Sequence, residues 1–324
     1  MDRTVVCDLC PRHCTLSPHQ IGACGARHEC DGQVLPIRHG LLSAIHDDPI
    51  EKKPLNHFFP GSRALSLGGF GCNLMCRGCQ NYSISRVNAM QGNGFEMSID
   101  EIIDTAKSHR DRSIAYTYNE PIVWWEYMDE IAAAARNAHL KNVMVTAGYV
   151  SEHMREKIFA HIDAANVDLK GFSEEFYRQW ANGALQPVLD TIEFLHQKTN
   201  FWLEITTLII PGQNDSPQTL DSEFAWIAEH LGTDVPVHLS AFFPMYKATD
   251  IPSTPETALY RARDLAHQFG LKYVYLGNVM EPSDTICPSC GKTVIHRLGY
   301  HIDDSGLEDG HCRNCHHPIS GCFA

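Results

Sequence analysis

Three cysteines at C-x3-C-x2-C spacing are the residues of this chain best suited to chemistry. Cys72, Cys76 and Cys79 lie in a glycine-rich turn directly after a short apolar run at 64–67. A [4Fe–4S] cluster normally takes four thiolates, so three thiolates with no obvious fourth leave one iron open to another ligand. A structural zinc knuckle and three unrelated buried cysteines are the alternatives. The spacing, the glycines and the preceding strand favour the cluster.

An open iron in such a cluster can be chelated by the amino and carboxylate groups of S-adenosylmethionine (SAM). An electron from the reduced cluster then breaks a carbon–sulfur bond of the sulfonium and leaves a 5'-deoxyadenosyl radical. The three-cysteine loop therefore predicts an enzyme that cleaves SAM reductively.

Longer stretches of the chain resemble the radical SAM enzymes of the AmmeMemoRadiSam system, which are distant relatives of the pyruvate formate-lyase activating enzymes. The resemblance begins in the segment around the three cysteines, at 48–85, and includes the last forty residues. Between them it includes Y-T-Y-N-E-P (116–121), V-D-L-K-G-F (167–172), T-T-L-I-I-P-G-Q-N-D (206–215) and Y-V-Y-L-G-N (273–278). It implies a [4Fe–4S] cluster, SAM, a reductase or flavodoxin-type electron donor, and Memo-like and AMMECR-like companion proteins.

Composition limits the remaining classes of function. The chain has 324 residues and is 44% hydrophobic, which suits one large domain with small appendages. A formal net charge of −13 argues against a nucleic-acid-binding surface. There is no run of eighteen apolar residues and no apolar signal-peptide core, so we expect a cytoplasmic protein without a membrane segment. In a reducing compartment, thirteen cysteines in three groups favour metal sites over disulfides.

The middle of the chain alternates strand patterns with helix patterns. Strands are predicted at 63–67, 113–118, 142–146, 165–169, 201–210, 235–241 and 272–276. Ser98 and Glu101 form a capping box at the start of one intervening helix. Repeated βα units give an α/β fold with a parallel sheet, and the resemblance implies a partial (β/α)6 TIM-like radical SAM barrel. We therefore expect a Cys-rich N-terminal segment with an E-K-K-P lid (1–62), a core barrel (63–281) and a zinc-ribbon-like tail (282–324).

The E-K-K-P stretch carries charges ahead of the first predicted strand. Glu51, Lys52, Lys53 and His57 could fold over the barrel mouth, where two lysines would suit a carboxylate or phosphate of a substrate. A solvated charge cluster is the alternative. A lid at the mouth would favour a small substrate over a peptide loop.

Glu120 directly follows the second predicted strand and is a candidate ligand for SAM. Catalytic residues of barrels gather at the carboxyl ends of the strands. The Glu120 carboxylate could accept a hydrogen bond from the ammonium group of SAM, or it could simply stabilise the start of a helix. Two departures from the resemblance, Gly78 in place of an aromatic residue and Ala147 in place of Asn, affect the expected adenine and ribose contacts.

Further polar candidates lie on later strands. Asp168 and Lys170 share one face at the end of the fourth strand, where they could reach SAM or the substrate, or form a buried ion pair. Glu204 and Thr206 have the same spacing on the fifth strand. His238 on the sixth strand is a further candidate for cofactor binding, with a core role as the alternative.

Cysteine pairs at both ends of the chain have the spacing of metal ligands. In the tail, Cys287, Cys290, Cys312 and Cys315 form two C-x2-C knuckles, which are typical of structural zinc. A rubredoxin-type iron site or an auxiliary cluster is the alternative. At the front, four further cysteines predict a second metal, which could be zinc or an iron–sulfur cluster: Cys7, Cys10, Cys14 and Cys24.

Together these features predict a radical SAM enzyme that abstracts hydrogen from an unidentified small substrate. A glycyl-radical activase that acts on the backbone of another protein is the first alternative. A non-enzymatic iron–sulfur carrier or redox sensor is the second, but a carrier should have four cysteines for its cluster.

Overall fold

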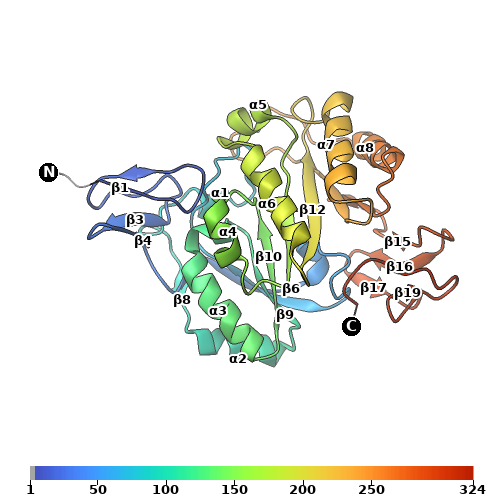
Figure 1. Cartoon of the computed structure of the whole chain (residues 1–324), viewed down its shortest axis with the longest axis horizontal. Coiled ribbons are helices and arrows are strands. Elements are labelled where there is room, and N and C mark those ends of the chain that lie inside the picture. The colour runs from blue at the N-terminus through green and yellow to red at the C-terminus, as the bar shows by residue number, and fades with distance from the viewer. Residues whose placement is uncertain (1–3, 324) are drawn as a thin grey trace.

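The structure, a computed structural model, describes residues 4–323 and centres on one eight-stranded sheet (Figure 1). The strand order is β14-β13-β12-β11-β10-β9-β7-β6, and every neighbouring pair is parallel except β6 with β7. Within the described residues the edge strands β6 and β14 do not pair, so the sheet remains a partial barrel. The strands are β6 (Ala44–Pro49), β7 (Arg63–Gly68), β9 (Ser113–Tyr116), β10 (Lys141–Thr146), β11 (Ala164–Asp168), β12 (Trp202–Ile209), β13 (Val237–Ala241) and β14 (Val274–Gly277).

Helices cover the outer face of this sheet. Alternate residues such as Leu65, Leu67 and Val167 point outward and pack against the apolar faces of the helices in one large core. The capping box at Ser98 and Glu101 is confirmed at the start of α2. The longer helices are α2 (Ile99–His109), α3 (Trp125–Asn137), α4 (Glu152–Ile158), α6 (Gln186–Gln197), α7 (Pro217–His230) and α8 (Glu256–Gln268). Short turns of helix are η1 (Ile50–Lys52), α1 (Tyr82–Ser85), η2 (Pro121–Trp124), α5 (Glu174–Phe176) and η3 (Tyr177–Ala181).

The E-K-K-P stretch does not lie over the barrel mouth, and the expected lid is wrong. Residues 44–49 form the antiparallel edge strand β6, whose last residue, Pro49, lies opposite Arg63, the first residue of β7. The connecting residues 50–62 must therefore lie at the amino end of the parallel strands, opposite the end that carries the cysteine loop. The barrel begins at β6 rather than at residue 63.

Residues 50–62, here named the floor segment, close the amino end of the barrel through contacts with its inner face. The backbone N–H groups of Asn56 and His57 donate to the two carboxylate oxygens of Glu204, at 3.0 and 2.7 Å. The side-chain amide of Asn166 donates to the carbonyl oxygen of Pro54 at 2.8 Å. Both partners of the floor segment come from the inner face of β11 and β12. The floor segment therefore closes the amino end of the barrel interior.

Small sheets lie at both ends of the molecule (Figure 1). The front has β1 (Val5–Val6) with β2 (Thr15–Leu16), β3 (Arg27–Cys30) with β4 (Gln33–Pro36), and β5 (Leu41–Leu42) with β8 (Phe95–Glu96). The tail has β15 (Thr285–Ile286), β16 (Thr293–Leu298), β17 (His301–Asp303), β18 (Leu307–Glu308) and β19 (His311–Cys312). The tail packs its own small core against Tyr273 and Tyr275 of the β14 region. None of the described helices has the length and apolar character needed to cross a membrane. Residues 1–3 and 324 of the expected terminal segments lie outside the described part of the chain.

Candidate functional site

The three-cysteine loop leaves the carboxyl end of β7 and is fixed by hydrogen bonds on both sides. On one side the N–H of Cys72 donates to the carbonyl oxygen of Cys24 at 3.1 Å. Gly71 has a φ of +83°, and a Cβ there would lie 2.3 Å from that same carbonyl oxygen, so only glycine fits. On the other side the N–H of Met75 donates to the carbonyl oxygen of Ala181 at 2.7 Å.

Asn119, the second residue of the Y-N-E-P motif, clamps this loop. Its side-chain oxygen accepts from the N–H of Gly69 at 3.0 Å, and its amide nitrogen donates to the carbonyl of Gly71 at 2.8 Å. The neighbouring carbonyl of Tyr118 accepts a further hydrogen bond from Asn81, just beyond the last cysteine. Sequence reasoning missed Asn119, although an Asn at a strand end beside a glycine-rich loop is the signal that could have found it.

The sulfur atoms of Cys72 and Cys76 are enclosed by protein. Burial raises the pKa of both thiols, and each is raised further by a neighbouring cysteine thiolate. Among the described residues, Cys72, Cys76 and Cys79 do not come within 4.8 Å of one another as a group. The three sulfur atoms therefore lack the compact arrangement of ligands that share a single ion.

The Glu120 carboxylate is buried close to the cysteine loop, with 2% of the residue exposed. One oxygen accepts from the Thr146 hydroxyl at 2.6 Å, and the other accepts from the N–H of Ala147 at 2.9 Å. Burial raises its pKa, while these donors and the charge of Lys170 act in the opposite direction. Ala147, which lacks the expected amide side chain, thus positions Glu120 through its backbone.

Asp168 and Lys170 lie together at the end of β11, with their charged atoms 2.9 Å apart. Their side chains are 35% and 22% exposed, so the pair is half-buried rather than sealed in the core. Burial lowers the pKa of Lys170, but the Asp168 carboxylate and the Cys76 thiolate outweigh it, and the net shift is upward. Lys170 is thus held charged beside the cysteine loop, with Asp168 as its anionic partner.

Thr206 and His238 occupy neighbouring positions on β12 and β13, and Asp168 pairs with Thr206 from the other side. The buried Thr206 hydroxyl has no hydrogen-bond partner within the described residues, and an unpaired buried hydroxyl indicates room for an external partner. His238 instead bonds Glu204 through Nε2 at 2.6 Å. Glu204 therefore supports the floor segment, whereas the role of His238 in cofactor binding stays a prediction.

Two aromatic rings occupy the space beside Gly78. A Cβ at Gly78 would lie 2.8 Å from the ring of Phe242 and 2.9 Å from that of Trp180. The two rings stand edge-to-face with centroids 6.1 Å apart. They supply from η3 and from the end of β13 the apolar surface that the resemblance places at position 78. Single-residue reasoning could not find them, because they lie about 100 and 160 positions further along the chain.

The two lysines of the floor segment do not face a substrate. Lys53 is buried, and its Nζ lies 2.7 Å from the Asp48 carboxylate. The Nζ of Lys52 lies 2.8 Å from the other oxygen of the same carboxylate. The Tyr118 hydroxyl also donates to Asp48, at 2.6 Å. The expectation that these lysines meet a substrate anion at the barrel mouth is therefore wrong, because both ammonium groups are held on Asp48, which pairs with the amino end of β7.

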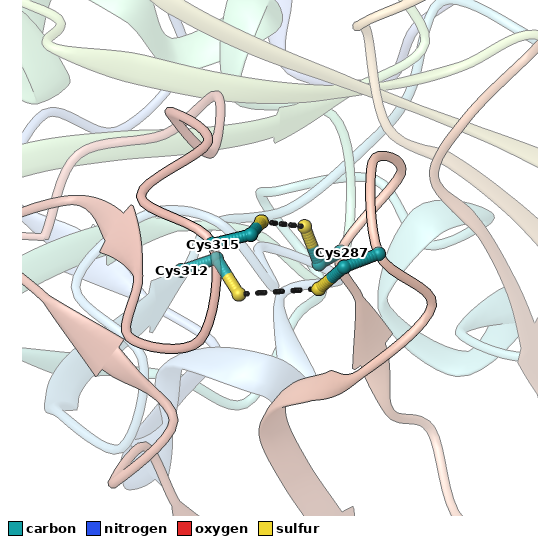
Figure 2. A group of neighbouring side chains, drawn as sticks. Cys287, Cys312 and Cys315 are labelled. Carbon is teal, nitrogen blue, oxygen red and sulfur yellow. Dashed lines mark hydrogen bonds between the residues drawn. The ribbon is translucent and has the colours of Figure 1, made fainter.

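The four tail cysteines converge on one point (Figure 2). Their sulfur atoms all lie within 4.8 Å of one another, with Cys287 and Cys315 3.6 Å apart and Cys290 and Cys312 3.7 Å apart. Metal–sulfur bonds of about 2.3 Å in a tetrahedron place sulfur atoms roughly 3.8 Å apart. The tail therefore has the geometry of a site for a single tetrahedral ion.

Comparisons with known proteins agree with this arrangement of residues. The family model described as the radical SAM superfamily matches residues 67–222. The chain belongs to the radical SAM superfamily. The uncharacterized protein MJ0808 of Methanocaldococcus jannaschii is 38% identical over 322 residues, which are 98% of this chain and 96% of that protein. This radical SAM protein is also 23% identical to the 4-hydroxyphenylacetate decarboxylase activating enzyme of Clostridioides difficile over 179 residues, 52% of this chain and 55% of that enzyme.

Solved structures show the same fold at low sequence identity. A radical SAM methyltransferase from Sphaerobacter thermophilus has a TM-score of 0.52 and 14% identity, over 73% of this chain and 71% of that one. Streptococcus suis SuiB bound to S-adenosylmethionine has a TM-score of 0.51 and 12% identity, over 71% of this chain and 53% of that one. The partial barrel is thus the fold that this radical SAM protein shares with both structures.

Proposed function

We propose that this protein is a radical SAM enzyme of the AmmeMemoRadiSam type that abstracts hydrogen from a small substrate. The observation that carries the proposal is the gathering of a three-cysteine loop, Glu120, Asp168 with Lys170, and the unpaired Thr206 hydroxyl at the carboxyl end of one partial barrel. Three thiols in one short loop fit a [4Fe–4S] cluster with one open iron. When bound, the cluster supplies the electron that cleaves SAM to methionine and a 5'-deoxyadenosyl radical.

The residues of the chain have distinct parts in this proposal. Cys72, Cys76 and Cys79 would hold the cluster in the loop that Asn119 clamps. Glu120 would accept a hydrogen bond from the SAM ammonium group. Asp168 and Lys170, with Thr206 as a further donor, would orient the ribose and carboxylate of SAM or the substrate, and Trp180 and Phe242 would exclude water from the adenine.

A second candidate function is the activation of a glycyl-radical enzyme. The similarity to an activating enzyme over half of the chain favours it. The expected lid, which argued for a small substrate, closes the floor instead, so that argument for a small substrate no longer holds. We place the small substrate first because the Asp168–Lys170 pair offers both charges to a compact polar molecule.

Reductive SAM cleavage tests the proposed function. Anaerobically reconstituted protein should release 5'-deoxyadenosine and methionine after reduction, and changing Cys72, Cys76 and Cys79 to Ala should abolish the release without unfolding the barrel. Undiminished cleavage in that variant would overturn the assignment. To separate the two substrates, extract is divided by molecular mass: stimulation by the small-molecule fraction supports our proposal, and stimulation by the protein fraction alone supports the activase.

The remaining parts of the proposal rest on spacing and resemblance. The tail geometry supports structural zinc at the four cysteines, and zinc should remain after the iron is stripped, because it has no redox chemistry. A metal at the front cysteines, a cytoplasmic location, a flavodoxin-type electron donor, and Memo-like and AMMECR-like companions belong to the same proposal. Zinc content tests the metal sites, and co-purification tests the electron donor and the companion proteins.

A further inference from the structure

The four front cysteines are brought together by a small hairpin that has no place in the site described above. Strands β1 and β2 pair antiparallel, and the N–H of Cys7 donates to the carbonyl of Cys14 at 2.9 Å. Between the two strands, a tight turn is closed by a hydrogen bond from the N–H of His13 to the carbonyl oxygen of Cys10, at 3.1 Å. Cys7, Cys10 and Cys24 all join the apolar core that also contacts the cysteine loop.

The spacing of these sulfur atoms differs from that in the tail. No three of Cys7, Cys10, Cys14 and Cys24 have their sulfur atoms within 4.8 Å of one another, whereas all four tail sulfurs do. The Cys7–Cys14 hydrogen bond and the turn at Cys10 nevertheless hold three of the four residues in one hairpin. Thiolates that are held together but lie too far apart to share one ion match a cluster in which each binds its own iron.

A buried arginine lies beside these cysteines. Arg27 is 6% exposed, and its two terminal nitrogens bond Glu126 at 2.8 and 2.6 Å. Its Nε has no partner within the described residues. The N–H of Gly22 donates to the carbonyl oxygen of Arg27 at 2.8 Å, which places Arg27 beside the turn that carries Cys24. An unpaired, buried N–H of a cation beside thiolates is the kind of donor that supports a cluster from outside its ligands.

Residues 7–24, here named the front module, touch the three-cysteine loop directly; this loop (72–79) is here also called the SAM loop. The carbonyl oxygen of Cys24 accepts the N–H of Cys72 at 3.1 Å, so one hydrogen bond joins the backbone of a front cysteine to that of a loop cysteine. Gly71 makes this approach possible, because any side chain there would strike the Cys24 carbonyl. The other side of the front module projects away from the barrel, toward one end of the molecule (Figure 1).

We propose that Cys7, Cys10, Cys14 and Cys24 hold an auxiliary [4Fe–4S] cluster that relays single electrons to the cluster of the SAM loop. The relay rests on the proposed function, since it needs a cluster at Cys72, Cys76 and Cys79. A low-potential flavodoxin-class donor loses one electron, the front cluster is reduced from 2+ to 1+ and then reoxidised, and the loop cluster gains that electron. No proton or bond is exchanged. The path leads from the exposed hairpin through Cys24 to Cys72.

Metal content tests the front cluster without touching the front module. The variant with Cys72, Cys76 and Cys79 changed to Ala should keep about four iron and four sulfide per chain, and wild type should hold about eight of each. After reduction with dithionite, the variant should show the electron paramagnetic resonance signal of one reduced cluster. A variant that holds no iron, or a wild type with a second zinc ion per chain, would overturn the proposal.

Electron transfer tests the relay itself. Cys10→Ser should lower the ratio of flavodoxin-driven to dithionite-driven SAM cleavage at least tenfold, because dithionite can reduce the loop cluster directly. Cys30→Ser is the matched control, because Cys30 ends β3 outside the proposed ligand set and its sulfur lies 4.0 Å from the carboxylate of Asp31. This variant should keep both the iron content and the ratio. An unchanged ratio in a Cys10→Ser protein that has lost about four iron atoms would refute the relay.

The two proposals fail in different ways. If the three-alanine variant loses all its iron and wild type still cleaves SAM, the front cluster is absent and the proposed function stands. If the variant keeps the wild-type iron content and still cleaves SAM, the loop assignment is wrong and the proposed function fails with it. Circular dichroism of each variant checks that the fold is retained.

Discussion

Replacing Glu204 by Gln should weaken the whole barrel, because this carboxylate holds the floor segment to the inner face of the sheet. Glu204 is fully buried and accepts four hydrogen bonds. One oxygen takes Asn56 N–H at 3.0 Å and His238 Nε2 at 2.6 Å; the other takes His57 N–H at 2.7 Å and Trp202 Nε1 at 3.0 Å. Burial acts to raise its pKa, but the bond and charge from His238 outweigh burial, and the net shift is downward.

The magnitude follows from counting donors. A glutamine keeps one acceptor oxygen and turns an NH2 group toward two N–H donors. The less costly orientation places that NH2 toward Asn56 and His238, because the His238 ring can change tautomer and accept. One buried N–H, that of Asn56, is then left unpaired, which costs about 1–3 kcal/mol, and the charge-assisted bonds to His57 and Trp202 weaken as well. We expect Glu204→Gln to lower the free energy of unfolding by roughly 2–4 kcal/mol.

Urea denaturation followed by tryptophan fluorescence measures this change, with anaerobic samples of matched metal content. Glu229→Gln on the exposed side of α7 is the control, and it should stay within about 0.5 kcal/mol of wild type. Because the pKa of Glu204 is lowered in the folded state, its contribution is present above its unfolded pKa and is lost as the pH falls through the folded value. A Glu204→Gln protein as stable as the control at pH 7 would refute the reasoning.

Three further predictions concern other parts of the molecule. Glu223→Gln should stabilise the protein by roughly 3–5 kcal/mol at pH 8. Burial raises the pKa of Glu223 to about 8, so the free energy of unfolding of the wild type falls as the pH rises from about 4.5 to 8. The variant should lose this pH dependence in urea melts. Glu120→Gln should weaken SAM binding by about 1–3 kcal/mol in calorimetry without changing iron content; normal binding would reduce Glu120 to a helix-start residue. Cys312→Ser, or chelation of the tail metal, should speed amide hydrogen exchange in the floor segment, because Cys322 of the tail accepts the N–H of Phe59 and donates to the carbonyl oxygen of His57, at 2.7 Å each. Unchanged exchange would contradict that coupling.

Much of the fold follows from local pattern. The seven predicted strands match the seven parallel strands of the sheet, because buried βα units carry apolar runs at strand spacing and capped helices between them. The capping box at Ser98 formed as expected, because both of its hydrogen bonds are local. Cysteine spacing likewise predicted the tail knuckles, since each C-x2-C pair is fixed within one turn.

The wrong expectations share one cause: a polar residue that is considered without its spatial neighbours looks free to bind a ligand. Lys52 and Lys53 look like ligands for a substrate anion until Asp48 is placed between them. The lid expected at Glu51–His57 is wrong for a similar reason, because nothing local indicates that the preceding run 44–49 pairs antiparallel with β7. That pairing alone moves residues 50–62 from the mouth to the floor.

The sequence by itself determined the chemistry of the loop, because Cys72, Cys76 and Cys79 lie within one short turn and their ligand number does not depend on distant residues. Only the tertiary structure decided what surrounds them. Asn119 reaches back across fifty positions to clamp the loop, Trp180 and Phe242 fill the space that Gly78 leaves, and Cys24 meets Cys72 through a glycine. Such contacts arise from strand order and close packing, which bring together residues that no local pattern connects.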